Sequence, residues 1–202
     1  SSMARANKIL IVCPQCDGDD VGENLCGYQW TSRLASRFNV TVLAQRFPGH
    51  RPPSEQLSGV RVIEWDAMPY LSGHQRFNSA VKPWYPNFYL RARRWIKEAV
   101  AAGEHFDLLH QLMPMAIRYP SPCTGFPLPF VIGPVGGGVA TPEGFRAELG
   151  TEPRFMKLRE FDRFRLRHDP MLRRTYEQAA AVICCSPYVS GHLANVATRR
   201  ID

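Results

Sequence analysis

A glycine-rich segment in the middle of the chain has the residue types best suited to binding a ligand. An apolar run at 129–132 leads toward Gly136-Gly137-Gly138, and Glu143 follows a few residues later. Consecutive glycines allow backbone N–H groups to come close to a ligand, and open α/β sheets bind ligands beyond the carboxyl ends of their strands. The segment therefore predicts a ligand-facing loop; a tight turn packed against another stretch of backbone is the alternative.

A polar loop at 15–24 follows the first apolar run and contains Gly22, Glu23 and Asn24. A loop in this position places the N–H groups of a helix start at the ligand edge of the sheet. It has neither Gly-x-Gly-x-x-Gly nor Gly-Lys-Ser/Thr, so neither a dehydrogenase-type nor an ATPase-type phosphate loop is supported. We predict these three residues as binding residues. For the aspartates of 17–20 there are two alternatives: they are site residues, or they belong to a solvated acidic loop.

Three further side chains, His110, Cys13 and Cys16, could carry chemistry. His110 ends a predicted strand on the same edge as the glycine segment, so it is predicted as a binding residue, with a packed core histidine as the alternative. The spacing of Cys13 and Cys16 is typical of a redox pair or half a zinc site. However, the predicted helix starts well after the motif and no second suitably spaced pair exists, so a redox enzyme is disfavoured and we predict no metal ion.

Strand-like and helix-like segments alternate along the chain, and Asn24 is the predicted N-cap of the first helix. The predicted strands are 8–13, 40–44, 59–65, 106–110 and 181–185, together with one around Pro129 whose apolar run is 130–132. The predicted helices are 25–38, 88–102, 153–166, 170–180 and 187–197, with 68–86 irregular and with Asp169-Pro170 and Ser186-Pro187 as helix-start signals. This order predicts an α/β fold: a doubly wound parallel sheet in a three-layer αβα, Rossmann-like domain. We expect a single domain over 1–202, in which Ser1-Ser2 before Met3 is a cloning remnant.

Composition limits the classes of partner. Of 202 residues, 45% are hydrophobic and 21% charged, no apolar run reaches membrane-span length, and the six cysteines do not form a disulfide framework. We therefore expect a reduced, cytoplasmic protein.

The net charge of +7 favours anionic partners. The basic segment Arg154–Arg174 predicts peripheral contact with the inner face of a membrane; a solvated helix whose aromatic side chains enter the core is the alternative. Nucleic acid is not an expected partner, because no binding module is present and acidic residues interrupt the basic ones.

Taken together, four segments resemble the N-terminal half of a GT-B glycosyltransferase, in the large retaining group called family 4. They are 8–27 with its polar loop, the Asp107-Leu108-Leu109-His110 strand, the glycine segment 129–143, and the closing strand and helix at 180–193. The sequence departs from the family where many members carry a histidine after the fifth strand, since Gly133-Pro134-Val135 stands there. No catalytic residue is therefore transferred.

The resemblance implies transfer of a sugar from a nucleotide-sugar donor to a glycan or lipid-linked acceptor, with retention and without a cofactor or obligatory metal. It implies that this domain supplies the acceptor side and that the C-terminal, donor-binding domain is absent from this chain. Gly22, Glu23 and Asn24 would line the acceptor and sugar-phosphate side, the 136–138 loop would approach the transferred sugar, and Glu143 would be a hydrogen-bonding residue. The alternative is a non-catalytic α/β ligand-binding domain, or a subunit that needs a partner chain.

Overall fold

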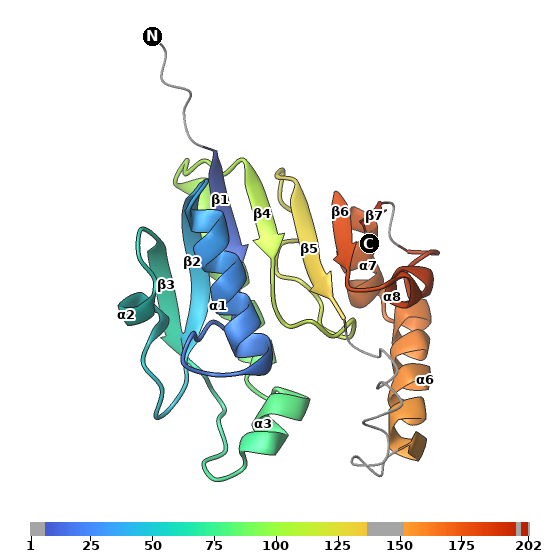
Figure 1. Cartoon of the computed structure of the whole chain (residues 1–202). Coiled ribbons are helices and arrows are strands. Elements are labelled where there is room, and N and C mark those ends of the chain that lie inside the picture. The colour runs from blue at the N-terminus through green and yellow to red at the C-terminus, as the bar shows by residue number, and fades with distance from the viewer. Residues whose placement is uncertain (1–6, 137–151, 197–198, 202) are drawn as a thin grey trace.

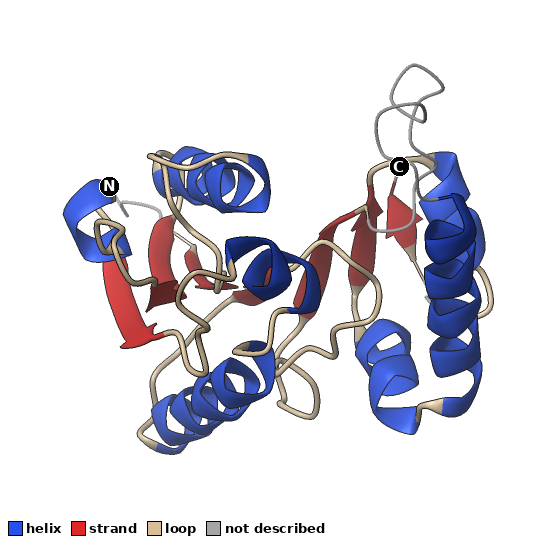
Figure 2. Cartoon of the chain, turned by 90° about the horizontal axis from the view of Figure 1, so that it is seen from below, coloured by secondary structure: helices blue, strands red, loops and turns tan. Residues whose placement is uncertain are grey.

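The computed structural model describes residues 7–136, 152–196 and 199–201 of the chain. The strands of these residues form one seven-stranded sheet in the order β3-β2-β1-β4-β5-β6-β7. All neighbouring strands run parallel. Helices lie on both faces of this sheet, as the view in Figure 2 shows. The predicted α/β class and the doubly wound parallel sheet are therefore confirmed.

The elements follow one another as strand and helix, apart from two stretches where helices are consecutive (Figure 1). The strands are β1 (Lys8–Val12), β2 (Asn39–Arg46), β3 (Arg61–Asp66), β4 (Leu108–Gln111), β5 (Phe130–Val135), β6 (Ala181–Cys184) and β7 (Arg200–Ile201). The helices are α1 (Gly22–Ala35), α2 (Pro53–Gln56), α3 (Gln75–Val81), α4 (Tyr85–Ala101), α6 (Glu152–His168), α7 (Pro170–Gln178) and α8 (Pro187–His192).

Side chains of the central strand β1 alternate between two apolar cores. Leu10 and Val12 join the core that contains Phe88 of α4, whereas Ile9 and Ile11 join the core against α1. A parallel strand covered on both faces must be apolar at every position, because neither face meets water. This is why β1 reads as a continuous apolar run.

The start of α1 differs from the prediction. The helix begins at Gly22, and Val21 rather than Asn24 is its N-cap. Asn24 lies in the first turn, where its Nδ2 donates to Asp20 Oδ2 at 2.6 Å and its carbonyl oxygen accepts from the Asp17 N–H at 2.9 Å. These bonds fold the loop back onto the helix. Asn24, although a good capping residue, therefore lies inside the helix and not before it.

The segment predicted to be irregular at 68–86 contains the short helix α3. Its position depends on Asn78, a residue only 3% exposed, whose side chain accepts from the Leu71 N–H at 3.1 Å and donates to the Leu71 carbonyl at 2.8 Å. The elements α2 and β7 were also not predicted. All three are short and have little periodicity of their own. By contrast, both predicted helix-start signals are confirmed, because Asp169 and Ser186 accept N–H bonds from the first turns of α7 and α8.

A glycine bulge bends the end of β5. The pairing of β5 with β6 is irregular between Ile132 and Val135, and Gly133 between them has φ of 138°. A Cβ atom at Gly133 would lie 2.5 Å from the carbonyl oxygen of Ile183. Only glycine fits this approach, so the bulge directs the chain toward Gly136 at the carboxyl edge.

Candidate functional site

A cavity of about 360 Å³, lined by both polar and aromatic residues, lies among the loops that follow the carboxyl ends of β1, β2 and β3. Its wall includes the start of α1, with Gly22, Glu23 and Asn24, together with His50 from the loop after β2. We call it the Gln15 cavity, after the buried side chain that lines it. The three residues predicted from the loop at 15–24 are thus neighbours on one cavity wall.

Glu23 connects three parts of the chain. Its Oε1 accepts from the Met115 N–H at 2.9 Å, and its Oε2 accepts from Gln15 Nε2 at 3.3 Å. The same Oε2 pairs with Lys82 Nζ at 2.7 Å, and the Lys82 side chain is only 6% exposed. Glu23 therefore holds the first loop, the segment after β4 and the α3–α4 junction together. This network could not be read from sequence spacing, since Met115 is 92 positions away.

Two buried side-chain oxygens of residues that line this cavity have no hydrogen-bond partner among the described residues. They are Oε1 of Gln15 and Oδ1 of Asn24. Gln15 is 5% exposed, and its Nε2 is already used by Glu23. Both oxygens are themselves shielded from solvent, so they are unsatisfied acceptors inside the packed loop, and such atoms are uncommon in folded proteins.

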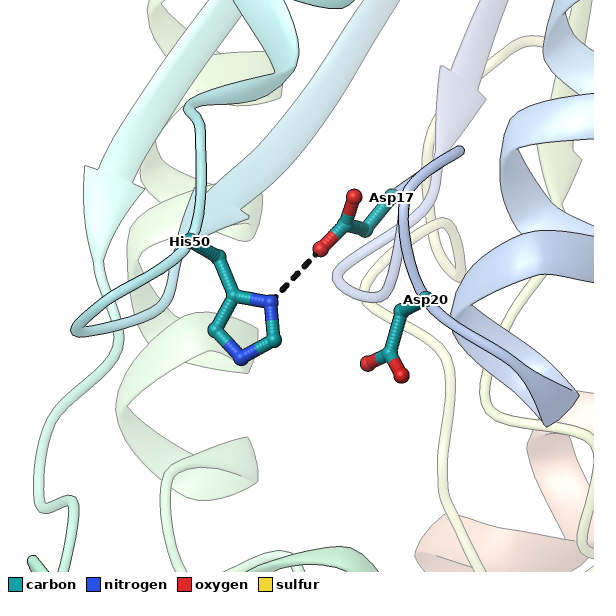
Figure 3. A group of neighbouring side chains, drawn as sticks. All are labelled: Asp17, Asp20 and His50. Carbon is teal, nitrogen blue, oxygen red and sulfur yellow. Dashed lines mark hydrogen bonds and ion pairs between the residues drawn. The ribbon is translucent and has the colours of Figure 1, made fainter.

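A buried carboxylate orients a histidine at the same cavity (Figure 3). Asp17 Oδ2 lies 2.8 Å from Nδ1 of His50, and Asp17 is 3% exposed. The other oxygen of Asp17 accepts from the Asp19 N–H at 2.9 Å and from Gln56 Nε2 at 3.0 Å. Asp17 is therefore not part of a solvated acidic loop. Sequence analysis did not single out His50, since nothing near it in the chain marks it and its partner is 33 positions away.

The ligand atoms of Asp17, Asp20 and His50 lie within 4.8 Å of one another, which is a spacing that a divalent cation could accept. Both oxygens of Asp17 already take part in hydrogen bonds. Those of Asp20 accept from the Val21 N–H at 2.8 Å and from Asn24 Nδ2. The cluster is thus satisfied as a hydrogen-bonded network, and a cation would have to replace some of these bonds.

Part of the glycine segment is described. Gly136 N donates to the Met115 carbonyl at 3.0 Å, so the segment leaves β5 beside the residue that also binds Glu23. Gly137, Gly138 and Glu143 lie outside the described residues, and their predicted roles stay predictions. The glycine segment and the α1 start therefore meet at Met115.

The side chain of His110 is packed inside the protein. It is 4% exposed, its Nε2 lies 2.7 Å from the Gly133 carbonyl oxygen, and its ring meets Trp30 edge-on at 6.0 Å. Burial lowers the pKa of His110, with the hydrogen bond to Gly133 opposing that effect. His110 is not among the residues that line the Gln15 cavity. Its predicted binding role stays a prediction.

The cysteine pair shows no sign of redox activation. Cys13 is buried, and its thiol donates to the Gln15 carbonyl at 3.1 Å. Burial, followed by the neighbouring Cys16, raises the pKa of the Cys13 thiol well above its ordinary value. A redox nucleophile needs the opposite shift, because the thiolate is the reactive form.

Aromatic side chains of the basic segment are exposed. On α6, Phe161 is 52% exposed and Phe164 is 61% exposed, so neither enters the core. The alternative of a solvated helix with buried aromatics therefore fails for these two residues. Among the described residues, no helix is both long and apolar enough to cross a membrane.

Comparison with known proteins finds similarity among solved structures. No protein-family model matches the sequence, and no curated protein matches it. Among solved structures, the chain is similar to a sucrose-phosphate synthase from Thermosynechococcus elongatus, with a TM-score of 0.52 and 16% sequence identity. The similarity covers 96% of this chain and 47% of that one, so this chain spans about half the length of that enzyme. At this identity the likeness shows the fold: an α/β domain that matches half of a GT-B enzyme.

Proposed function

We propose that this chain is the acceptor-side domain of a retaining glycosyltransferase, which moves a sugar from a nucleotide-sugar donor to a glycan or lipid-linked acceptor. A second α/β domain would bind most of the donor. The observation that carries the proposal is the coincidence of two features. The fold matches half of a glycosyltransferase over nearly the whole chain, and the Gln15 cavity lies beyond the carboxyl ends of the strands, where open α/β sheets bind ligands.

Each part of the site would have its own role in sugar transfer. Gly22, Glu23 and Asn24 would line the acceptor and sugar-phosphate side, while Gly136 and the two glycines after it would approach the transferred sugar. Backbone N–H groups would stabilise the charge that develops on the departing phosphate, as preorganised donors do in group transfer. Glu23 would act chiefly as a positioning residue, because both of its carboxylate oxygens are held by protein groups.

The proposal is tested by an assay of sugar transfer with the protein encoded by the full reading frame that contains this chain. A panel of nucleotide sugars and glycan acceptors would be incubated with the protein, and products would be identified by mass spectrometry. We expect one pair to react, and we expect Gly137→Val to lower kcat/KM about 100-fold, because a displacement of roughly 1 Å near a reacting group can cost that much.

Gly191→Ala serves as the control, since a Cβ atom at Gly191 meets nothing within 4 Å. If Gly137→Val left transfer intact, the role given to the glycine segment would be wrong. If no nucleotide sugar reacted or bound, the alternative of a non-catalytic binding domain or partner-dependent subunit would replace the proposed activity.

We also propose that the segment 154–174 contacts an anionic membrane surface. Phe161 and Phe164 are exposed on α6 among the arginines of this segment, and basic side chains near a membrane are attracted to anionic lipids. In sedimentation with vesicles of phosphatidylglycerol and phosphatidylcholine, replacing both phenylalanines with serine should weaken binding about 10-fold or more. Phe77→Ser, which changes an exposed phenylalanine on α3, should leave binding unchanged. Equal loss with Phe77→Ser, or equal binding to pure phosphatidylcholine, would contradict this proposal.

A further inference from the structure

We propose that a basic pocket between α6, α7 and α8 binds a phosphate group, which is carried by a lipid headgroup or by a soluble phosphoester. This pocket, which we call the Arg167 pocket, has a volume of about 560 Å³. Its basic and amide-bearing lining residues are Arg163, Arg167 and His168 of α6, Arg173 of α7, His192 of α8, and Asn195. Figure 1 shows α8 beside the C-terminal end of α6. The inference concerns a different site from the Gln15 cavity and does not depend on sugar transfer.

The charge of the Arg167 pocket is unbalanced. Three arginines line it, and Glu160 is the only acidic residue among its described lining residues. Arg173 also pairs with Glu177, at 3.0 Å, so its charge is partly offset. Positive charges that face one hollow repel each other, and a bound anion would remove this repulsion.

Arg163 and Arg167 have no carboxylate partner among the described residues. Glu160, three positions before Arg163, forms no ion pair with either of them in the part of the chain that the structure describes. By contrast, Arg165 on the same helix is paired, with its Nη2 at 2.7 Å from Oδ2 of Asp169. Two like charges at positions i and i+4 of a helix destabilise it. The pair Arg163 and Arg167 is therefore better explained by a ligand than by the stability of α6.

The donors at the pocket suit a phosphate group. A guanidinium group has five N–H donors and no acceptor, and it binds phosphate through two parallel hydrogen bonds. Asn195 adds a side-chain amide from the segment after α8. A phosphate has three acceptor oxygens and up to two negative charges, so it can accept from several elements at once. A carboxylate has two oxygens in one plane and a single charge, and it suits this arrangement less well.

The pocket also has an apolar part. Leu166 and Val196, which are 6% and 8% exposed, line it. Phe164 is an exposed lining residue whose ring lies 4.6 Å from that of His168. Inorganic phosphate has no carbon atoms to place against these side chains, whereas a phosphoester does. We therefore expect a phosphoester to bind more tightly than inorganic phosphate.

Titration of the ¹⁵N-labelled chain, followed by NMR, tests the inference. The probes are glycerol 3-phosphate, inorganic phosphate and acetate. We expect glycerol 3-phosphate to shift the Nε–H signals of Arg163 and Arg167 saturably, phosphate to bind more weakly, and acetate to bind most weakly. Arg167→Gln should weaken glycerol 3-phosphate binding about 10-fold, the effect of one lost hydrogen bond between charged groups. Arg167→Lys keeps the charge but loses the paired hydrogen bonds, so its loss should be smaller.

Arg174→Gln is the matched control. It removes the same charge one position after Arg173, from an exposed residue that lines a different hollow, and it should leave binding nearly unchanged. If Arg167→Gln fails to fold, Asn195→Trp at an exposed position outside the helices provides a second test, because the larger side chain should block the pocket. The absence of a saturable shift with glycerol 3-phosphate, equally tight binding of acetate, or an equal loss with Arg174→Gln would each overturn the inference.

Sedimentation with vesicles distinguishes the two sources of the phosphate group. The vesicles contain phosphatidylcholine with or without phosphatidic acid. If a lipid headgroup occupies the pocket, Arg167→Gln should weaken binding to the phosphatidic acid vesicles more than Arg174→Gln does. If the two variants bind these vesicles equally and only glycerol 3-phosphate binding is lost in Arg167→Gln, the ligand is a soluble phosphoester.

Failure of this inference is distinguishable from failure of the proposals above. Binding of glycerol 3-phosphate at the Arg167 pocket without sugar transfer by the full protein would leave the inference standing and overturn the proposed activity. Weaker vesicle binding after replacement of Phe161 and Phe164, without any effect of Arg167→Gln in either assay, would support the membrane contact and overturn the inference.

Discussion

Replacing Gly27 with alanine is expected to destabilise the protein by about 3 kcal/mol and to displace the loop that forms the Gln15 cavity. Gly27 is buried on α1, and a Cβ atom there would lie 2.1 Å from the Gln15 carbonyl oxygen and 2.7 Å from Cys13 Sγ. Neither contact is tolerable, and the oxygen belongs to the backbone, so it cannot move without the loop. Alanine is the better helix former by roughly 1 kcal/mol, but this gain is smaller than the cost of the overlap.

Urea denaturation followed by circular dichroism would measure the effect, and Gly191→Ala is the matched control. Gly191 lies on α8 with nothing within 4 Å of the added Cβ, so this variant should stay within about 1 kcal/mol of the parent protein. Equal stability of Gly27→Ala and Gly191→Ala would show that the helix does not approach the Gln15 backbone as closely as described.

Replacing Glu23 with alanine is expected to cost about 3 kcal/mol, because it leaves a buried ammonium group without its carboxylate. Lys82 is 6% exposed and pairs with Glu23 at 2.7 Å, while the Glu23 side chain is 24% exposed. The Met115 N–H and the Gln15 amide lose an acceptor in the same variant. We therefore expect both a lower free energy of unfolding and changed amide signals around Gln15 and Met115.

A double-mutant cycle with Lys82→Met separates the ion pair from the other bonds of Glu23. If the buried charge causes the loss, Glu23→Ala with Lys82→Met should be less destabilised than the sum of the two single variants. Arg94 and Glu98, which form an exposed pair on α4 at 3.6 Å, provide the comparison. Removing that pair should change stability by less than about 0.5 kcal/mol. Additive losses at Glu23 and Lys82 would contradict the described coupling.

The parts of the fold that could be predicted are those specified by local pattern. The strands β1, β2 and β6 are apolar because both of their faces are covered, and this requirement appears directly in the sequence. The helix starts at Asp169-Pro170 and Ser186-Pro187 depend on residues within three positions of one another. Alternation of such elements then restricts the topology to a parallel doubly wound sheet.

The errors in the prediction have a common physical cause. Asn24 is a good capping residue, yet it lies inside α1 because its side chain binds Asp20. The helix α3 forms where no periodicity is visible, because the buried side chain of Asn78 holds the preceding turn at Leu71. In both cases the side chain of an asparagine forms hydrogen bonds with a neighbouring turn, and these bonds override local preference.

The α/β class, the parallel sheet and the edge at which the predicted binding residues lie all follow from local patterns, since apolar runs and turn residues act over a few positions. Which side chains share the candidate site depends on the folded chain as a whole. It brings His50 to Asp17, Glu23 to Met115 and Lys82, and it leaves His110 packed against Trp30. These pairings join positions far apart in the chain, and they form only when the loops of successive strands meet at one edge of the sheet.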